Sequence, residues 1–255
     1  MSELHLIQRS LPDQPELSTA ISRAILIRAA AGELPPTIRI HRPGREVAFG
    51  RQDVVAPGYE DAAQAARASG FAAVERLAGG RAALFHEHTI AFARAYPDPE
   101  PPRRTYERFE EMAGVVAAAL KRLGIDARVG EVPGEYCPGA YSVNARGATK
   151  LSGVGQRMIR GGAHVGGVVV AAGEDLLARV LDPVYAALGL EWDTATSGSA
   201  SAELGREVTR DELIEAVIAE LGERHTLVPA DVDETTLELA HTLLDRVSVG
   251  DPTPG

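Results

Sequence analysis

The chain has little cysteine and little lysine. Among its 255 residues are a single cysteine, Cys137, and only two lysines, Lys121 and Lys150. One cysteine excludes an intrachain disulfide and a zinc site built from several cysteines. Cys137 is therefore either a small buried filler residue or a reactive thiol. Because nearly all cations are arginines, a lysine hints at a position that needs a compact ammonium group.

Long apolar runs and known nucleotide motifs are absent as well. No run approaches the roughly 18 to 20 apolar residues of a membrane span, and residues 1–16 lack the basic and apolar parts of a signal peptide. A net charge of −10 disfavours general nucleic-acid binding. There is no phosphate-binding loop motif, and Met158 stands where a dinucleotide fingerprint would need glycine. We therefore expect a cytoplasmic protein without membrane or nucleic-acid partners.

Hydrophobic periodicity predicts helices and strands that mix without regular alternation, which favours an α+β fold over a doubly wound parallel sheet. The predicted helices are 16–31, 59–69, 104–123, 174–188, 209–222 and 233–247. The predicted strands are 37–41 and 46–50, joined as a hairpin, then 71–77, 82–86 and 89–95, and the strand pair 150–159 and 164–171.

A double glycine between two predicted strands is the first candidate for a binding site. Gly79 and Gly80 are flanked by Arg76 and Arg81. Adjacent glycines allow a backbone to approach a ligand closely, and arginines offer donors to an anionic or carbonyl group. The alternative is an ordinary turn with charged flanks.

The second candidate is the strand that begins at Lys150. On a regular strand Lys150, Ser152 and Val154 would share one face, and Gly153 would leave room beside it. An ammonium group there could stabilise a carbonyl oxygen or a phosphate. The alternative is an edge-strand lysine that discourages aggregation.

Cys137 is the third candidate. Pro138-Gly139 follows it and predicts a turn that presents the thiol on a loop. Close to Lys150 or His86, the thiol would have a lowered pKa and could act as a nucleophile.

The segment His86-Glu87-His88 is a weak candidate for a metal site. On a strand, the two histidines would point to the same face. No third ligand accompanies them, so we prefer histidines that are solvated or hydrogen-bonded and predict no metal.

Taken together, these segments resemble the biotin/lipoyl protein ligase family, which includes lipoate–protein ligase A and the octanoyltransferases. Segment 76–86 resembles the arginine-led, glycine-rich acyl-binding loop of that family, and segment 150–156 resembles its lysine signature. Segments 164–167 and 49–52 resemble a histidine-glycine strand and an upstream strand end. Order and spacing agree across residues 15–190.

The resemblance implies a fold and a set of site residues. We expect a mixed β-sheet with surrounding helices, with a catalytic domain over residues 1–190. Residues 191–255 would form a helical segment packed on it, which could belong to the same domain. The implied catalytic residues are Cys137 and Lys150. The implied substrate-binding residues are Arg76, Gly79, Gly80, Arg81, His86, Ser152, Gly153, Gln156 and His164.

The cysteine segment 136–141 resembles the amidotransferase branch of the family. It implies transfer of an octanoyl or lipoyl group through a Cys137 thioester to the lysine of lipoyl domains, such as the glycine cleavage H-type protein or the E2 domains of 2-oxoacid dehydrogenases. No tightly bound cofactor is implied, and octanoate or lipoate is the transferred group. One alternative is an ATP-dependent lipoate ligase that works through lipoyl-AMP with ATP and Mg, in which Cys137 is structural. The other is a non-catalytic paralogue that binds lipoyl domains.

An acidic partner would need a local basic patch on this negatively charged chain. Clustering in the sequence points to Arg103, Arg104, Arg157 and Arg160 as that patch.

Overall fold

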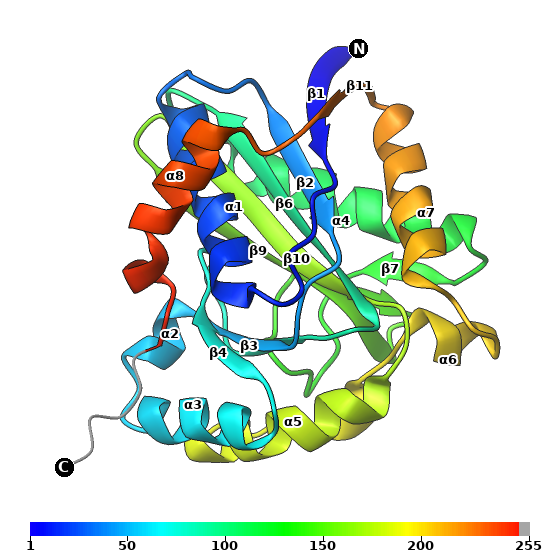
Figure 1. Ribbon diagram of the computed structural model, residues 1–255. Helices are drawn as coiled ribbons and strands as arrows, with labels where there is room; N and C mark the ends of the chain where they lie inside the picture. Colours follow the sequence, from blue (N-terminus) through cyan, green and yellow to red (C-terminus); the bar gives the residue numbers. More distant parts are fainter. Residues whose placement is uncertain (250–255) are drawn as a thin grey trace.

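The centre of the protein is an eight-stranded mixed sheet, seen in a computed structural model that describes residues 1–249 (Figure 1). The strand order is β11-β1-β2-β6-β10-β9-β8-β7, in which β11, β1 and β2 run parallel and the other neighbours are antiparallel. The strands are β1 Ser2–Ile7, β2 Thr37–His41, β6 Thr89–Pro97, β7 Ala127–Val129, β8 Val143–Ala145, β9 Thr149–Ile159, β10 Gly162–Val170 and β11 His225–Ala230.

A second, three-stranded sheet lies below the main sheet in Figure 1. It has the order β4-β3-β5, with β3 at Glu46–Phe49, β4 at Ala72–Glu75 and β5 at Ala83–Phe85. The predicted hairpin of 37–41 and 46–50 is therefore wrong, because β2 and β3 belong to different sheets. Every residue of both strands is buried, and each strand takes an interior place with two neighbours, which a hairpin would not provide.

The long predicted helices are confirmed to within a few residues. The helices are α1 Pro15–Ala30, α2 Arg51–Val54, α3 Tyr59–Ala68, α4 Thr105–Arg122, α5 Glu174–Ala187, α6 Ala200–Leu204, α7 Arg210–Gly222 and α8 Glu234–Thr242, with 3₁₀ turns at Pro101–Arg104, Thr194–Thr196 and Leu244–Arg246. The Thr209 side chain caps α7 by accepting a hydrogen bond from the Glu212 N–H, as the Thr-x-x-Glu pattern predicts.

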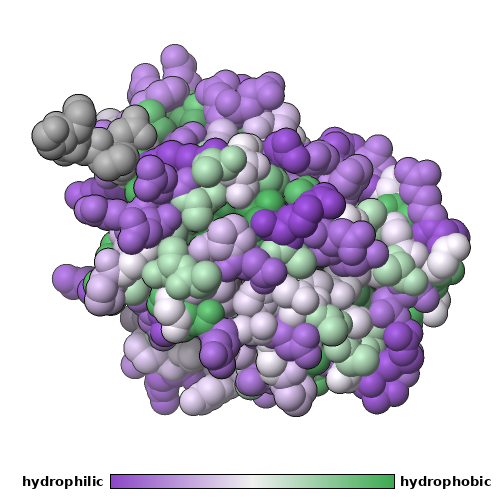
Figure 2. Space-filling model, turned by 90° about the horizontal axis from the view of Figure 1, so that it is seen from below, coloured by the Kyte–Doolittle hydropathy of each residue, from purple (hydrophilic) through white to green (hydrophobic). Residues whose placement is uncertain are grey.

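Helices cover both faces of the main sheet, which confirms the expected architecture. Helices α4 and α7 bury one large hydrophobic cluster, and α1 and α8 bury another on the opposite face (Figure 1). Helices α3 and α5 pack together and close a third cluster with the smaller sheet. Figure 2 shows the face on which α3 and α5 lie. Hydrophilic and hydrophobic side chains are mixed on this face, which is ordinary for a protein surface.

Residues 191–249 contribute a strand as well as helices. Strand β11 pairs in parallel with β1, while α7 packs on α4 and α8 packs on α1. The sequence analysis did not predict β1 or β11. Among the described residues, no helix has the length and apolar character needed to cross a membrane.

Candidate active site

Cys137 lies on the loop between β7 and β8, in a left-handed backbone conformation with φ of 43°. A non-glycine residue rarely adopts this conformation unless its surroundings hold it there. The Cys137 N–H donates to the Tyr185 hydroxyl oxygen at 2.8 Å, and this hydroxyl donates to the Ala82 carbonyl at 2.9 Å. Tyr185 thereby ties the cysteine loop to the second sheet.

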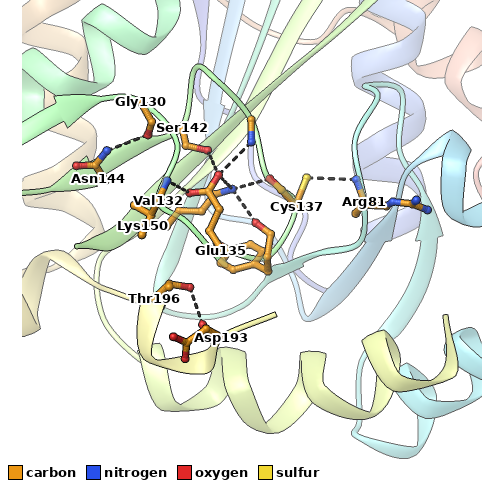
Figure 3. Close-up of polar contacts among 12 residues, drawn as sticks. Arg81, Gly130, Val132, Glu135, Cys137, Ser142, Asn144, Lys150, Asp193 and Thr196 are labelled. Atoms are coloured by element: carbon orange, nitrogen blue, oxygen red, sulfur yellow. Dashed lines mark hydrogen bonds and ion pairs between the residues drawn. The ribbon is translucent and has the colours of Figure 1, made fainter. Parts of the chain in front are cut away.

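The Glu135 carboxylate organises the rest of this loop (Figure 3). Its Oε2 accepts from the Val132 N–H at 3.1 Å. Its Oε1 accepts from the Gly139 N–H at 3.1 Å and the Ser142 hydroxyl at 2.5 Å, and the Lys150 ammonium lies 3.2 Å away. The side chain is fully buried. The role of Glu135 was not predicted from the sequence, although the segment around it was named. The signal that could have indicated it is a carboxylate two residues before the lone cysteine.

Lys150 faces the cysteine loop from β9. Its Nζ donates to the Tyr136 carbonyl at 2.8 Å and to the Cys137 carbonyl at 2.7 Å, besides its contact with Glu135. It also lies 4.7 Å from the centre of the Tyr136 ring. An ammonium group has three N–H donors, and here each has an acceptor. Lys150 is thus a buried positive charge held in place beside the thiol-bearing residue.

A shift in strand pairing aims Lys150 at the loop. On β8, Asn144 pairs with Lys150 while Val143 pairs with Ser152, so Leu151 is an extra residue on β9. An extra residue of this kind re-aims the side chains beside it. The prediction that Lys150 and Ser152 share one face of a regular strand is therefore wrong. Ser152 is buried away from the ammonium, and its hydroxyl has no hydrogen-bond partner among the described residues.

Two donors lie close to the Cys137 sulfur. The Arg76 Nη2 is 3.3 Å from Sγ, and the Arg81 backbone N–H donates to Sγ at 3.2 Å. Gly80 permits this approach, because a Cβ there would lie 2.8 Å from Sγ and its φ is 95°. The double glycine therefore brings a backbone donor and a guanidinium to the thiol, as the sequence analysis expected of a close backbone approach.

The positive surroundings of the thiol outweigh its burial. Burial by itself would raise the pKa of Cys137, but the Arg76 guanidinium, the Lys150 ammonium and the Arg81 N–H together lower this pKa below its ordinary value. A thiol with a lowered pKa has a larger thiolate fraction near neutral pH, and the thiolate is the nucleophilic form.

A cavity of about 250 Å³ opens beside the sulfur. Many of its walls are apolar or aromatic, including the stacked rings of Phe109 and Tyr141, whose centres are 4.9 Å apart. The predicted site residues that line it are Arg76, Gly79, Gly80, Cys137, Lys150, Gly153 and Gln156. The Gln156 side chain also accepts from Arg108 Nε at 2.6 Å, which links β9 to α4.

Four other predicted site residues do not line this cavity. Ser152 and His164 are absent from its walls, and Arg81 contributes its backbone while its guanidinium lies 3.4 Å from Asp53. His86 lies in the turn between β5 and β6 and accepts from the His88 N–H at 3.2 Å. The expected strand placement of these two histidines is therefore wrong, and burial lowers the pKa of His86 to about 4.

A smaller cavity of about 70 Å³ shares the Arg76 wall and contains His164. Burial lowers the pKa of His164 to about 4 and also lowers that of His41. Burial, aided by Glu16 and opposed by Arg39, raises the pKa of Glu46 to about 8. All three groups are therefore mainly uncharged at pH 7. Within residues 1–249, no group of three or more potential metal ligands comes together.

Comparison with known proteins identifies the class of catalytic domain to which this fold and this cysteine-containing cavity belong. The model of the lipoyl protein ligase A/B catalytic domain matches residues 14–222, so the chain belongs to this family. A lipoate-protein ligase A bound with ATP superposes with a TM-score of 0.77 at 21% identity, covering 96% of this chain and 95% of that one. A bipartite lipoate protein ligase from Thermoplasma acidophilum, solved with its E2 lipoyl domain, gives 0.73 at 20% identity, covering 96% and 93%. These neighbours confirm the fold.

Relatives in sequence carry a more specific name. An octanoyl-[GcvH]:protein N-octanoyltransferase from Geobacillus kaustophilus is 29% identical over 148 residues, which are 58% of this chain and 52% of that protein. One of the same name from Oceanobacillus iheyensis is 26% identical over 164 residues, which are 63% and 58%. The chain spans about half the length of the curated relatives it matches.

Proposed function

We propose that this protein transfers an octanoyl or lipoyl group to the acceptor lysine of lipoyl domains through a thioester on Cys137. The observation that carries the proposal is the Cys137 sulfur, which lies between the Arg76 guanidinium and the Arg81 N–H on the wall of a largely apolar cavity. The relatives named as octanoyltransferases support the same reaction, with a glycine cleavage H-type protein as one carrier.

The reaction has two steps with one leaving group each. The Cys137 thiolate attacks the acyl carbonyl carbon of the donor, a C–S bond forms, and the donor lysine leaves as an amine after taking up a proton. The neutral amine of the acceptor lysine then attacks the thioester, an amide forms, and the thiolate leaves while the amine gives up its proton. No oxidant, reductant or nucleotide is consumed.

The positive groups around the sulfur have separate tasks in this scheme. Arg76 and Lys150 stabilise the thiolate by their charge, and the Arg81 N–H is a donor placed for negative charge that develops near the sulfur. Because all three Lys150 donors are occupied, its ammonium also fixes the carbonyls of Tyr136 and Cys137. Contact between Lys150 and an acyl oxygen would require one of these acceptors to be exchanged.

The cavity beside the thiol would bind the acyl chain. Burial of a methylene group contributes about 0.8 kcal/mol, so an eight-carbon chain gains enough to hold its carbonyl at the sulfur. Gly155 is required where β9 packs closely on the glycine loop, since a Cβ there would lie 2.8 Å from the Ala78 Cβ, whereas a Cβ on Gly153 would make an ordinary contact 3.5 Å from the Lys150 Cε.

We also infer that residues 1–190 contain every group in this scheme but not the whole catalytic domain, because the family model extends to residue 222 and β11 pairs with β1 in the main sheet. The following segment would then support it through α7 on α4 and α8 on α1.

Intact-mass analysis after incubation with octanoylated H protein tests the proposal. We expect an octanoyl adduct that hydroxylamine removes and that is absent in Cys137→Ser. If the wild-type protein forms no adduct but modifies the acceptor with free lipoate and ATP, and Cys137→Ser does so equally well, ligation replaces transfer and the cysteine is structural. Binding of the H protein without either reaction would indicate a non-catalytic binding protein.

A further inference from the structure

An arginine-rich groove lies next to the thiol cavity, and Arg76 lines both of them. It has a volume of about 530 Å³ and lies among α1, α2, the end of β9 and the 3₁₀ turn after α8. Five arginines line it, namely Arg23, Arg51, Arg76, Arg157 and Arg246. Glu75 is its one acidic lining residue, and its carboxylate already accepts a hydrogen bond from Tyr59 at 3.1 Å.

Most charges of this groove have no paired acidic side chain among residues 1–249, although Glu75 lies in the groove and Arg76 contacts the Cys137 sulfur. The guanidinium groups of Arg51, Arg157 and Arg246 make no hydrogen bond or ion pair with residues 1–249, and the buried Arg23 Nε has no partner there either. Burial, together with repulsion from Arg157 and Arg246, lowers the pKa of Arg23. Arg51, Arg157 and Arg246 are exposed, so water screens their repulsion and Glu75 offsets part of it at Arg23, but five like charges around one groove still favour an anionic group there.

The predicted basic patch is retained only in part, because Arg103 and Arg104 have acidic partners and Arg160, which like Arg179 has no partner among residues 1–249, does not line the groove. Arg103 pairs with Glu100 at 2.6 Å and Arg104 pairs with Glu107 at 2.9 Å, so both are neutralised locally. Of the four arginines in that prediction, Arg157 joins the groove instead.

The composition of the groove favours a protein over a small anion. Apolar side chains from α1 and α2 lie between the arginines, and Val55 is 77% exposed. Arginines around exposed apolar residues are typical of protein–protein interfaces. The location also fits, because Arg76 is part of this groove and at the same time contacts the Cys137 sulfur.

We propose that this groove docks an acidic surface of the carrier domain beside its modified lysine, an inference that rests on the proposed transfer function. With a net charge of −10, the chain repels an acidic partner over much of its surface, so an uncompensated arginine cluster selects where that partner binds. A domain docked here would lie beside the thiol, because Arg76 lines both the groove and the thiol cavity.

Binding of octanoylated H protein to Cys137→Ser variants tests the docking without turnover. Adding Arg51→Glu and Arg157→Glu should raise Kd by about tenfold or more and remove most of its salt dependence. The milder pair Arg51→Gln and Arg157→Gln should show a smaller rise. Arg128→Glu with Arg179→Glu, which changes the net charge equally at exposed positions on β7 and α5, should leave Kd unchanged.

The readouts separate docking from chemistry. With octanoyl-N-acetylcysteamine, a small thioester that needs no docking, the Arg51 and Arg157 variants with Cys137 intact should be acylated at the wild-type rate. Unchanged H-protein binding in folded Arg51→Glu/Arg157→Glu protein would overturn the docking proposal. If the same variant lost ATP binding but kept H-protein binding, the groove would be assigned to a nucleotide. Absence of acylation with any donor, together with weakened H-protein binding, would defeat the transfer function and leave the docking surface standing.

Discussion

The thiol cavity and the smaller cavity that contains His164 are both lined by Arg76, and they stabilise their buried ionisable groups in opposite ways. Around the thiol, Glu135 and Lys150 have charged and backbone partners at hydrogen-bond distance (Figure 3), and the Arg76 guanidinium donates to the Arg81 carbonyl at 2.7 Å. In the neighbouring cavity, His41, Glu46 and His164 have pKa values shifted toward their neutral forms. A buried ionisable group either keeps its charge with a paired, hydrogen-bonded partner or becomes neutral by a change of protonation. This protein has groups of both kinds in neighbouring cavities.

The difference indicates which cavity suits the proposed acyl transfer. Paired charges cannot move without losing their partners, so they fix the backbone that bears Cys137 and keep a positive field on its sulfur. Neutral groups exert no such field at pH 7, and their wall is compatible with an apolar occupant. The comparison can be tested by removing single members from each side.

Removal of the Lys150 charge should have the largest effect. Lys150→Met would leave the Glu135 carboxylate buried without its cation, and breaking a buried pair costs about 3 to 5 kcal/mol of unfolding free energy. Denaturant titration measures this loss. Lys121→Met removes the only other lysine from an exposed position on α4 and should change stability little. Equal stability of the two variants would show that the pair does not hold the loop.

Glu46 should produce the next largest effect, and only at higher pH. In the folded protein its carboxyl keeps a proton up to about pH 8, whereas in the unfolded chain it loses the proton near its ordinary value of 4.5. Between these values folding takes up a proton, so stability falls as the pH rises and levels off above pH 8. Glu46→Gln should remove this slope and gain about 1 kcal/mol over the wild type for each pH unit in that window.

Unfolding curves recorded between pH 5 and about 9 provide the measurement, since they bracket the window set by the Glu46 pKa. Glu60→Gln, at an exposed position on α3, is the matched control. A constant difference between Glu46→Gln and the wild type across this range would mean that the carboxyl is not held neutral.

Arg76 tests the field on the thiol. Arg76→Gln removes the guanidinium nearest to Sγ, so the pKa of Cys137 should rise and alkylation by iodoacetamide at pH 7 should slow by about tenfold. Arg179→Gln on α5 is the control. The pH profile of alkylation should shift to higher pH in the Arg76 variant, and an unshifted profile would refute the role of this charge.

Local features of the fold and the site could be predicted from the sequence, but contacts between distant segments of the chain could not. Helical periodicity placed α1, α4 and α5, and alternation placed the β9–β10 pair, because these signals depend on neighbours along the chain. The glycine at position 80 was also readable, since its φ of 95° and the close approach of the Cys137 sulfur restrict which residue can stand there, whereas neither restricts position 79.

Long-range register was outside the reach of such signals. The separation of β2 and β3 into two sheets depends on partners far along the chain, and the extra residue at Leu151 exists only relative to β8. Tyr185 lies 48 residues after Cys137, so its hydrogen bond to the cysteine loop has no local sequence pattern.

Tyr185 should show the smallest effect and the most specific one. Tyr185→Phe removes the acceptor of the Cys137 N–H and the donor to the Ala82 carbonyl, so stability should fall by about 1 kcal/mol. The loop would relax from its left-handed conformation, which lowers the rate of acylation by octanoyl-N-acetylcysteamine. Arg76 and Lys150 remain in place, so the midpoint of the alkylation pH profile should stay unchanged. Tyr106→Phe, at a residue that is 72% exposed, should alter none of these quantities. A shifted midpoint in the Tyr185 variant would mean that this hydroxyl changes the pKa of the thiol. Groups that set the charge around the sulfur could then not be separated from groups that set the geometry of the loop.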